Sequence, residues 1–188
     1  MDVFNDDLVK KWITGDVYFT NLRNKATERT HVENWMTTYF GKNIQGNKSW
    51  TTPISEALVF RYFELRNKPN TFTLERNLTY KVGKKLLKPD LTIRHNTTDL
   101  IDIYDVKCQS YTIDGTAHEK VLCTMYKYLP ILDNDTCINS LNIILVGKIE
   151  KLENYLINPQ STTQKAIIDL LKSKRANIMN FSDMVSQL

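Results

Sequence analysis

The sequence has few cysteines and histidines and no long apolar run, and each shortage excludes a class of protein. Its three cysteines, Cys108, Cys123 and Cys137, form neither a CxxC pair nor a complete disulfide set. The three histidines lack the spacing of zinc ligands. No apolar run approaches the length of a membrane span, and the acidic N-terminus has no signal-peptide core. We therefore expect a soluble, cytoplasmic protein in a reducing compartment, with no membrane partner.

The composition is that of a folded domain with a mild excess of positive charge. Hydrophobic residues make up 41% and charged residues 24% of the 188-residue chain, a globular rather than a disordered balance. The formal net charge of +4 is too small to demonstrate a polyanionic partner by itself, although clustered lysines would suit nucleic acid. We expect a single domain over residues 1–188, made of an N-terminal helical part (1–50), a core (51–148) and C-terminal helices (149–188).

A buried helix is the best-signalled element of the core. Thr52 is a candidate N-cap and Pro53 suits the first helical position. Apolar residues lie on most faces of this helix, which predicts that it is buried, and residues 67–70 end it. Further helices are expected at residues 6–13, 20–40, 114–128 (ended by Pro130), 149–156 and 161–174.

Strand patterns alternate with these helices. The expected strands are residues 71–82, 89–94, 100–108 and 141–147. The second and third form a hairpin around a turn at 95–98, and the fourth, an unbroken apolar run, is a central strand. This order of elements predicts an α/β fold, with a central mixed β-sheet flanked by helices.

Two acids and a lysine stand at the ends of the hairpin strands. Pro89-Asp90 begins one strand, and Asp105-Val106-Lys107 closes the other, 15 residues after Asp90. Because side chains alternate along a strand, Asp105 and Lys107 project from one face. Two carboxylates can hold a hard cation such as Mg²⁺, and Lys107 can place its charge beside an attacking water or a phosphate. The pattern is typical of metal-dependent phosphodiester cleavage, whereas a solvated, charged strand end is the simpler alternative.

The stretch from Glu56 to about Val146 resembles the PD-(D/E)XK nuclease superfamily. The resemblance is carried by the helix glutamate, Pro89-Asp90, Asp105-Val-Lys107 and the helix and strand that follow. The segment Asp114-Gly-Thr-Ala-His-Glu-Lys120 is similar to one in some small type II restriction endonucleases. The resemblance implies a restriction-endonuclease-like core, with residues 51–148 as its catalytic part.

The resemblance also implies a role for each matching residue. Asp90 and Asp105 would bind Mg²⁺, with Mn²⁺ as a substitute, and the Val106 carbonyl would add a ligand. Lys107 would be catalytic. Glu56 would bind the metal or its water, although an acid in the first turn of a helix is also stabilised by the helix dipole. Glu64 and Glu75 are rival third acids.

Several polar residues are candidates for binding DNA. Gln109 follows Lys107 on the same strand face and Lys120 lies in a first helical turn, but each could simply meet solvent. The lysines that lead into Asp90 would contact phosphates, which supply affinity without sequence information. The loop at 41–50 has side chains suited to reading base edges, as many surface loops do. The candidates in these two groups are Lys84, Lys85 and Lys88, and Asn43, Gln45 and Asn47.

The leading hypothesis is a sequence-specific, Mg²⁺-dependent endonuclease acting on double-stranded DNA, most simply as a homodimer with two active sites. One alternative is a structure-specific nuclease, such as a Holliday junction resolvase or a repair nuclease, with the same core. Another is a catalytically inactive DNA-binding module. The set of Asp90, Asp105 and Lys107 argues against that module, because a protein that only binds DNA has no need for two acids facing a polyanion.

Overall fold

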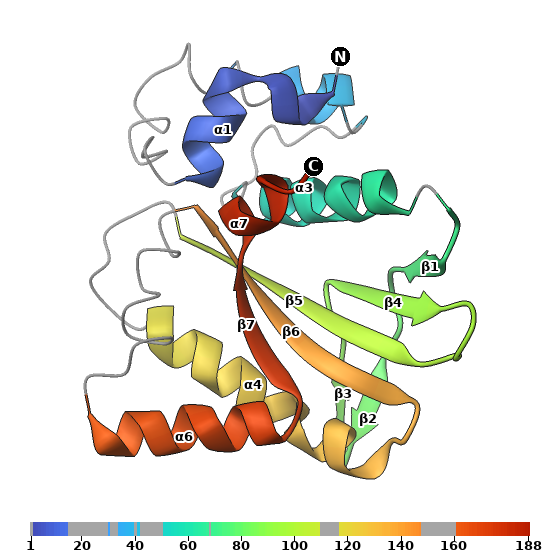
Figure 1. The fold of residues 1–188 in the computed structure, drawn as a ribbon, viewed down its shortest axis with the longest axis vertical. Helices are drawn as coiled ribbons and strands as arrows, with labels where there is room; N and C mark the ends of the chain where they lie inside the picture. The colour runs from blue at the N-terminus through green and yellow to red at the C-terminus, as the bar shows by residue number, and fades with distance from the viewer. Residues whose placement is uncertain are drawn as a thin grey trace.

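The central feature of the fold is a five-stranded mixed sheet (Figure 1). A computed structural model describes residues 2–14, 30, 34–39, 41, 51–67, 69–109, 117–147 and 161–188. The sheet has the order β1-β4-β5-β6-β7, with strands Phe72–Glu75, Leu91–His95, Ile101–Gln109, Ile138–Gly147 and Ala176–Asn180. β1, β4 and β5 are antiparallel neighbours, whereas β5, β6 and β7 run parallel. The expected α/β fold with a mixed sheet between helices is confirmed.

Helices cover both faces of the sheet (Figure 1). Helix α3 (Thr51–Arg66) packs on one face, where its apolar side chains meet those of β4 and β5. Helices α4 (Ala117–Asn134) and α6 (Thr162–Ser173) cover the other face. Both faces of β6 are buried, with Ile144 against α3 and Ile143 against α4. This burial explains the unbroken apolar run in that strand.

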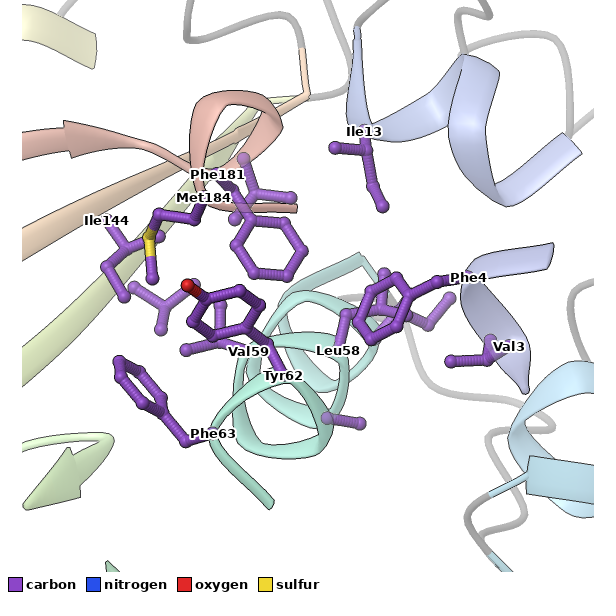
Figure 2. Packing of buried hydrophobic residues seen from close by; sticks show 14 of the residues in the cluster. Val3, Phe4, Ile13, Leu58, Val59, Tyr62, Phe63, Ile144, Phe181 and Met184 are labelled. Carbon is purple, nitrogen blue, oxygen red and sulfur yellow. The ribbon is translucent and has the colours of Figure 1, made fainter. Parts of the chain in front are cut away.

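The two ends of the described chain meet on the outer side of α3. The elements there are η1 (Val3–Asn5), α1 (Asp7–Ile13) and α7 (Phe181–Val185). Figure 2 shows Phe181 and Met184 of α7 beside Tyr62 of α3, with Phe4 reaching the same cluster from the N-terminal side. The Phe181 ring lies 6.0 Å from the Tyr62 ring and 6.1 Å from the Phe4 ring, measured between centroids. The second face of α3 is therefore also buried, as the sequence predicted.

The expected strand at 71–82 is divided in two, which corrects the sequence prediction. β1 ends at Glu75, and β2 (Tyr80–Val82) pairs instead with β3 (Lys85–Leu87) in a separate two-stranded sheet. The backbone leaves the β region at Asn77, where φ is 78°, and turns at Gly83, where φ is 59°. Left-handed φ suits glycine and is tolerated by asparagine. The β2–β3 hairpin consequently stands beside α4 rather than in the main sheet (Figure 1).

Helix α4 continues through Pro130 to Asn134, which is a second correction. A proline inside a helix removes one backbone hydrogen bond. Here Ile131 and Leu132, directly after it, are buried in the core and hold the chain helical. Asn134 Nδ2 also donates to the Pro130 carbonyl oxygen at 2.7 Å. Tertiary burial therefore outweighs the local cost.

The C-terminal part is not purely helical. Residues 176–180 form β7, which pairs in parallel with β6 and completes the sheet, so the division at residue 148 does not bound the core. The predicted helix at 149–156 and most of the one at 20–40 lie outside the described residues, although 34–39 are helical. Helix α3 already includes Thr51, so Thr52 is not its N-cap. Of the helices that are described, none is long and apolar enough to cross a membrane.

A polar network crosses the sheet at the end remote from Asp90. Asp102 of β5 is buried, with His95 Nε2 2.7 Å from its Oδ2. Asn139 and Ser140 of β6 both donate to its Oδ1. Asn142 Nδ2 donates to Ser140 Oγ at 2.7 Å. The network coincides with the irregularity between Ile101 and Asp102, where β6 contains one extra residue.

Candidate active site

The β4–β5 hairpin brings the two predicted acids together. The last pair of the ladder before the site is Leu91 with Tyr104, so the next step of the antiparallel register sets Asp90 opposite Asp105. Alternation along the strands places both acids, and Lys107, on the face that α4 covers. The site therefore lies where β4 begins, beside the second half of β5.

Asp90 is oriented by a backbone hydrogen bond. The N–H of Val106 donates to Asp90 Oδ2 at 2.7 Å. Burial raises the pKa of the Asp90 carboxyl, while this hydrogen bond and the charges of Lys107 and Lys88 act in the opposite direction. This hydrogen bond uses only Oδ2 of Asp90, and it fixes the orientation of the carboxylate.

Asp105 and Lys107 form a close ion pair. Asp105 is buried, with 8% of its surface exposed, and Lys107 Nζ contacts its Oδ1. Burial lowers the pKa of the Lys107 ammonium, and the neighbouring charge of Asp90 partly offsets that effect. A buried charge is costly unless it is paired. Each of these two residues therefore gives the other a partner of opposite charge inside the protein.

Glu56 lies in a cavity beside Asp90. The cavity has a volume of about 330 Å³ and is lined by Glu56, Arg76, Asn77, Lys88, Pro89 and Asp90. The rival acids are engaged elsewhere: Glu64 accepts from Arg61 at 3.2 Å, and Glu75 from Arg94 at 3.5 Å. Glu56 is thus the one of the three that shares a cavity with Asp90.

The donor atoms of the site suit a hard cation. Asp90 and Asp105 supply carboxylate oxygens. Because the N–H and C=O of one strand residue point to the same side, the Val106 carbonyl also faces the edge where Asp90 lies. These are oxygen ligands, as Mg²⁺ requires, and Mg²⁺ binds through one or two carboxylates while it retains waters. Within the described ranges, no three His, Cys, Asp or Glu side chains gather closely enough to hold a metal, so Glu56 does not complete a three-carboxylate set with the two aspartates.

The candidate DNA-binding residues fall into three groups. Lys88 lines the cavity. Lys84 and Lys85 are exposed on the β2–β3 hairpin, and Lys120 is exposed near the start of α4. Four predicted side chains lie outside what the structure describes: Gln109, whose backbone ends β5, and Asn43, Gln45 and Asn47.

Two residues near the site were not predicted from the sequence. Arg76 follows β1 and lines the cavity with Asp90. Tyr128 of α4 is buried, and its pKa is raised by burial and, secondarily, by the charge of Asp90. No local motif marks either residue, because β1–β4 pairing places Arg76 and helix packing places Tyr128.

Comparison with models of known protein families finds no match, and comparison with curated proteins finds none either.

Proposed function

We propose that the protein is a Mg²⁺-dependent nuclease of the PD-(D/E)XK superfamily, which hydrolyses phosphodiester bonds of double-stranded DNA. One observation carries the proposal: Asp90 and Asp105 face each other across a hairpin, with Lys107 in contact with Asp105 and the Val106 N–H bonded to Asp90. A strand end that is merely charged and solvated would not bring two acids and a lysine together out of water, because removing charged groups from water costs free energy. Charged groups in such an environment cluster at functional sites.

The order of elements supports a restriction-endonuclease-like core. A buried helix, three antiparallel strands, a second helix and a parallel strand follow one another as α3, β1-β4-β5, α4 and β6. The two helices cover opposite faces of the sheet. The β2–β3 hairpin and β7 are additions to this core.

The residues divide the chemistry between binding and charge stabilisation. Asp90, Asp105 and the Val106 carbonyl would hold Mg²⁺, and Glu56 would act from the neighbouring cavity. When bound, the ion polarises a phosphoryl oxygen and makes water a better nucleophile. Lys107 would place its charge beside Asp105, from where it would offset the negative charge that builds on the phosphate oxygens. Val106 fixes the orientation of Asp90 through its N–H.

We further propose that cleavage is sequence-specific and that the active species is a homodimer. Cutting both strands of a duplex at one place is most simply done by two symmetric active sites. The loop at 41–50 remains the candidate for base readout. Replacing Asn43, Gln45 and Asn47 together with alanine should relax or abolish specificity while leaving the acids of the site unchanged.

One digestion experiment tests the function. Purified protein is incubated with unbranched plasmid of mixed sequence, with Mg²⁺, with Mn²⁺ or with EDTA, and the cut ends are sequenced. Asp105→Asn, which preserves the shape of the side chain, controls for a contaminating nuclease. Discrete bands from wild type with Mg²⁺ or Mn²⁺, and none in EDTA or from Asp105→Asn, support the proposal. Random ends would remove the sequence specificity, cutting only at branched junctions would favour a resolvase, and equal cutting by Asp105→Asn would refute the site.

A further inference from the structure

Arg76 reaches the candidate site because of how β1 pairs with β4. The last pair of that ladder is Glu75 with Thr92. Continuing the register sets Arg76 alongside Leu91 and Asn77 alongside Asp90. The Arg76 and Asn77 side chains line the same cavity as Asp90 and Lys88. The cavity thus combines two cationic side chains with Asp90, one of the two aspartates proposed to hold a metal.

The Arg76 guanidinium is held in place by an aromatic ring. Its central carbon lies 3.7 Å from the centroid of the Phe60 ring on α3, a distance typical of stacking between arginine and an aromatic face. Burial lowers the pKa of Arg76, while the charges of Glu56 and Glu64 act in the opposite direction. Arg76 as a whole is exposed, and the contact with Phe60 holds its guanidinium at the cavity.

Arg76 differs from the other arginines in the described part of the chain. Arg61 and Arg94 donate to carboxylates, and Arg66 and Arg175 donate to backbone carbonyls. Arg76 donates no hydrogen bond to any residue that the structure describes. A guanidinium that stacking holds in place, with donors that no described residue uses, is already positioned to bind an anion.

We propose that Arg76, together with Lys88, forms a phosphate subsite that binds a backbone phosphate of the nucleic acid next to the phosphate being cleaved. The inference rests on the proposed function. A guanidinium presents paired N–H groups that match two phosphate oxygens. The cavity of about 330 Å³ accommodates a phosphodiester group, and Lys88 supplies a second positive charge within it.

The test compares DNA binding by full-length Arg76→Ala, Arg76→Lys and the matched control Arg66→Ala. Arg66 lies exposed at the end of α3, and its removal subtracts the same charge away from the cavity. Binding of a fluorescein-labelled, mixed-sequence DNA duplex is followed by anisotropy at several salt concentrations in EDTA, which prevents cutting. Cleavage in Mg²⁺ and thermal melting are measured on the same preparations.

Arg76→Ala should bind about 10- to 100-fold more weakly, as expected for losing a hydrogen bond to a charged group. The slope of log K against log salt should become shallower by about 0.9, the value for one phosphate contact. Arg76→Lys should keep the wild-type slope with intermediate affinity, because the charge remains and the paired donors are lost. Arg66→Ala should match wild type. Melting of Arg76→Ala should fall only slightly, since the change removes the contact with Phe60 but no hydrogen bond to a described residue.

The outcomes separate this inference from the nuclease proposal. If wild type cuts DNA and Arg76→Ala binds with unchanged affinity and slope, the phosphate subsite is refuted and the nuclease stands. If no preparation cuts DNA but Arg76→Ala loses affinity and slope, the subsite stands and the nuclease is refuted. If Arg76→Ala melts well below wild type, the salt dependence of DNA binding by Arg76→Lys is used instead, because that variant keeps the charge. A slope of log K against log salt as shallow for Arg76→Lys as for Arg76→Ala would refute the subsite.

Discussion

The backbone N–H of Val106 donates a 2.7 Å hydrogen bond to Oδ2 of Asp90, which joins the acid before β4 to the strand that carries Asp105 and Lys107. The contact between Lys107 and Asp105 fixes the second acid in the same way. Both carboxylates are thus oriented by the protein itself. Such pre-orientation lowers the cost of forming a metal site.

The two simplest changes at Asp90 should separate chemistry from stability. Asp90→Asn and Asp90→Ala should both lose cleavage, because each removes a carboxylate ligand. Asn can still accept from the Val106 N–H, so Asp90→Asn should melt close to wild type, whereas Asp90→Ala should lose about 1 kcal/mol. Cleavage rates and thermal melting are compared with Asp169→Asn, an exposed acid on α6. Wild-type cutting by either Asp90 variant would contradict the site.

Removing Lys107 should have opposite effects on cleavage and on metal binding. Lys107→Ala should cut at least about a hundredfold more slowly, by analogy with loss of one donor that stabilises a transition state. Mg²⁺ binding should be retained or become tighter, because the ammonium that contacts Asp105 Oδ1 no longer competes with the ion. Calorimetry and initial cutting rates measure the two effects. Lys127→Ala is the matched control, and a rate for Lys107→Ala within a few-fold of wild type would show that Lys107 only pairs with Asp105.

Glu56 should matter more to cleavage than Glu64 or Glu75. Glu56 shares a cavity with Asp90, while the other two are engaged by Arg61 and Arg94. Glutamine variants of all three are assayed side by side at limiting Mg²⁺, where a weakened metal site is exposed most clearly. Glu56→Gln should be the slowest. If Glu75→Gln were slowest instead, the third acid would approach from the β1 edge of the sheet.

The β2–β3 hairpin should contribute affinity without specificity. Lys84 and Lys85 are exposed there, beside α4 and ahead of Asp90 in the chain. The double alanine variant should weaken binding to all sequences and reduce the salt slope by up to about 0.9 per lysine that contacts a phosphate. Its cut positions should remain those of wild type. End sequencing and anisotropy against salt check both parts, and altered cut positions would mean that the hairpin reads bases.

Tyr80 should make stability fall at alkaline pH. Its hydroxyl is buried without a hydrogen-bond partner among the described residues, and burial raises its pKa from 10.0 to about 12. A raised pKa means that the contribution of the neutral phenol is complete below pH 10 and is lost as pH rises towards 12. Tyr80→Phe should therefore melt at or above the wild-type temperature at neutral pH and lose less stability across that window. Denaturant unfolding against pH measures it, with the exposed Tyr126→Phe as control.

The sequence predicted the parts of the fold that local patterns determine. The β4–β5 hairpin could be predicted because its turn and its alternating apolar residues are adjacent in the chain. Its prediction also located Asp90, Asp105 and Lys107. β7 could not be predicted, because Ala176–Asn180 is a short, mixed segment whose strand conformation comes from pairing with β6.

Other elements depend on contacts between distant residues. Pro130 suggested a helix end, but burial of Ile131 and Leu132 extends α4 past it. The split of 71–82 follows from Asn77 and Gly83, of which Gly83 is a turn signal that the sequence itself carries. Arg76 has no local signal at all, because its neighbours in the cavity come from α3 and from the start of β4.

The hydrogen bonds to Asp102 restrict the register of β6 against β5. β6 is apolar on both faces, so a shift by one residue against β5 would bury much the same surface, and hydrophobicity alone would not oppose it. Asp102 accepts from Asn139 and Ser140 together, and such a shift would leave this buried carboxylate without its donors. A few polar atoms thus set the register of the most apolar strand against β5. The pairing of β6 with the part of β5 that carries Asp105 and Lys107 depends on the same hydrogen bonds, although they lie at the other end of the strand.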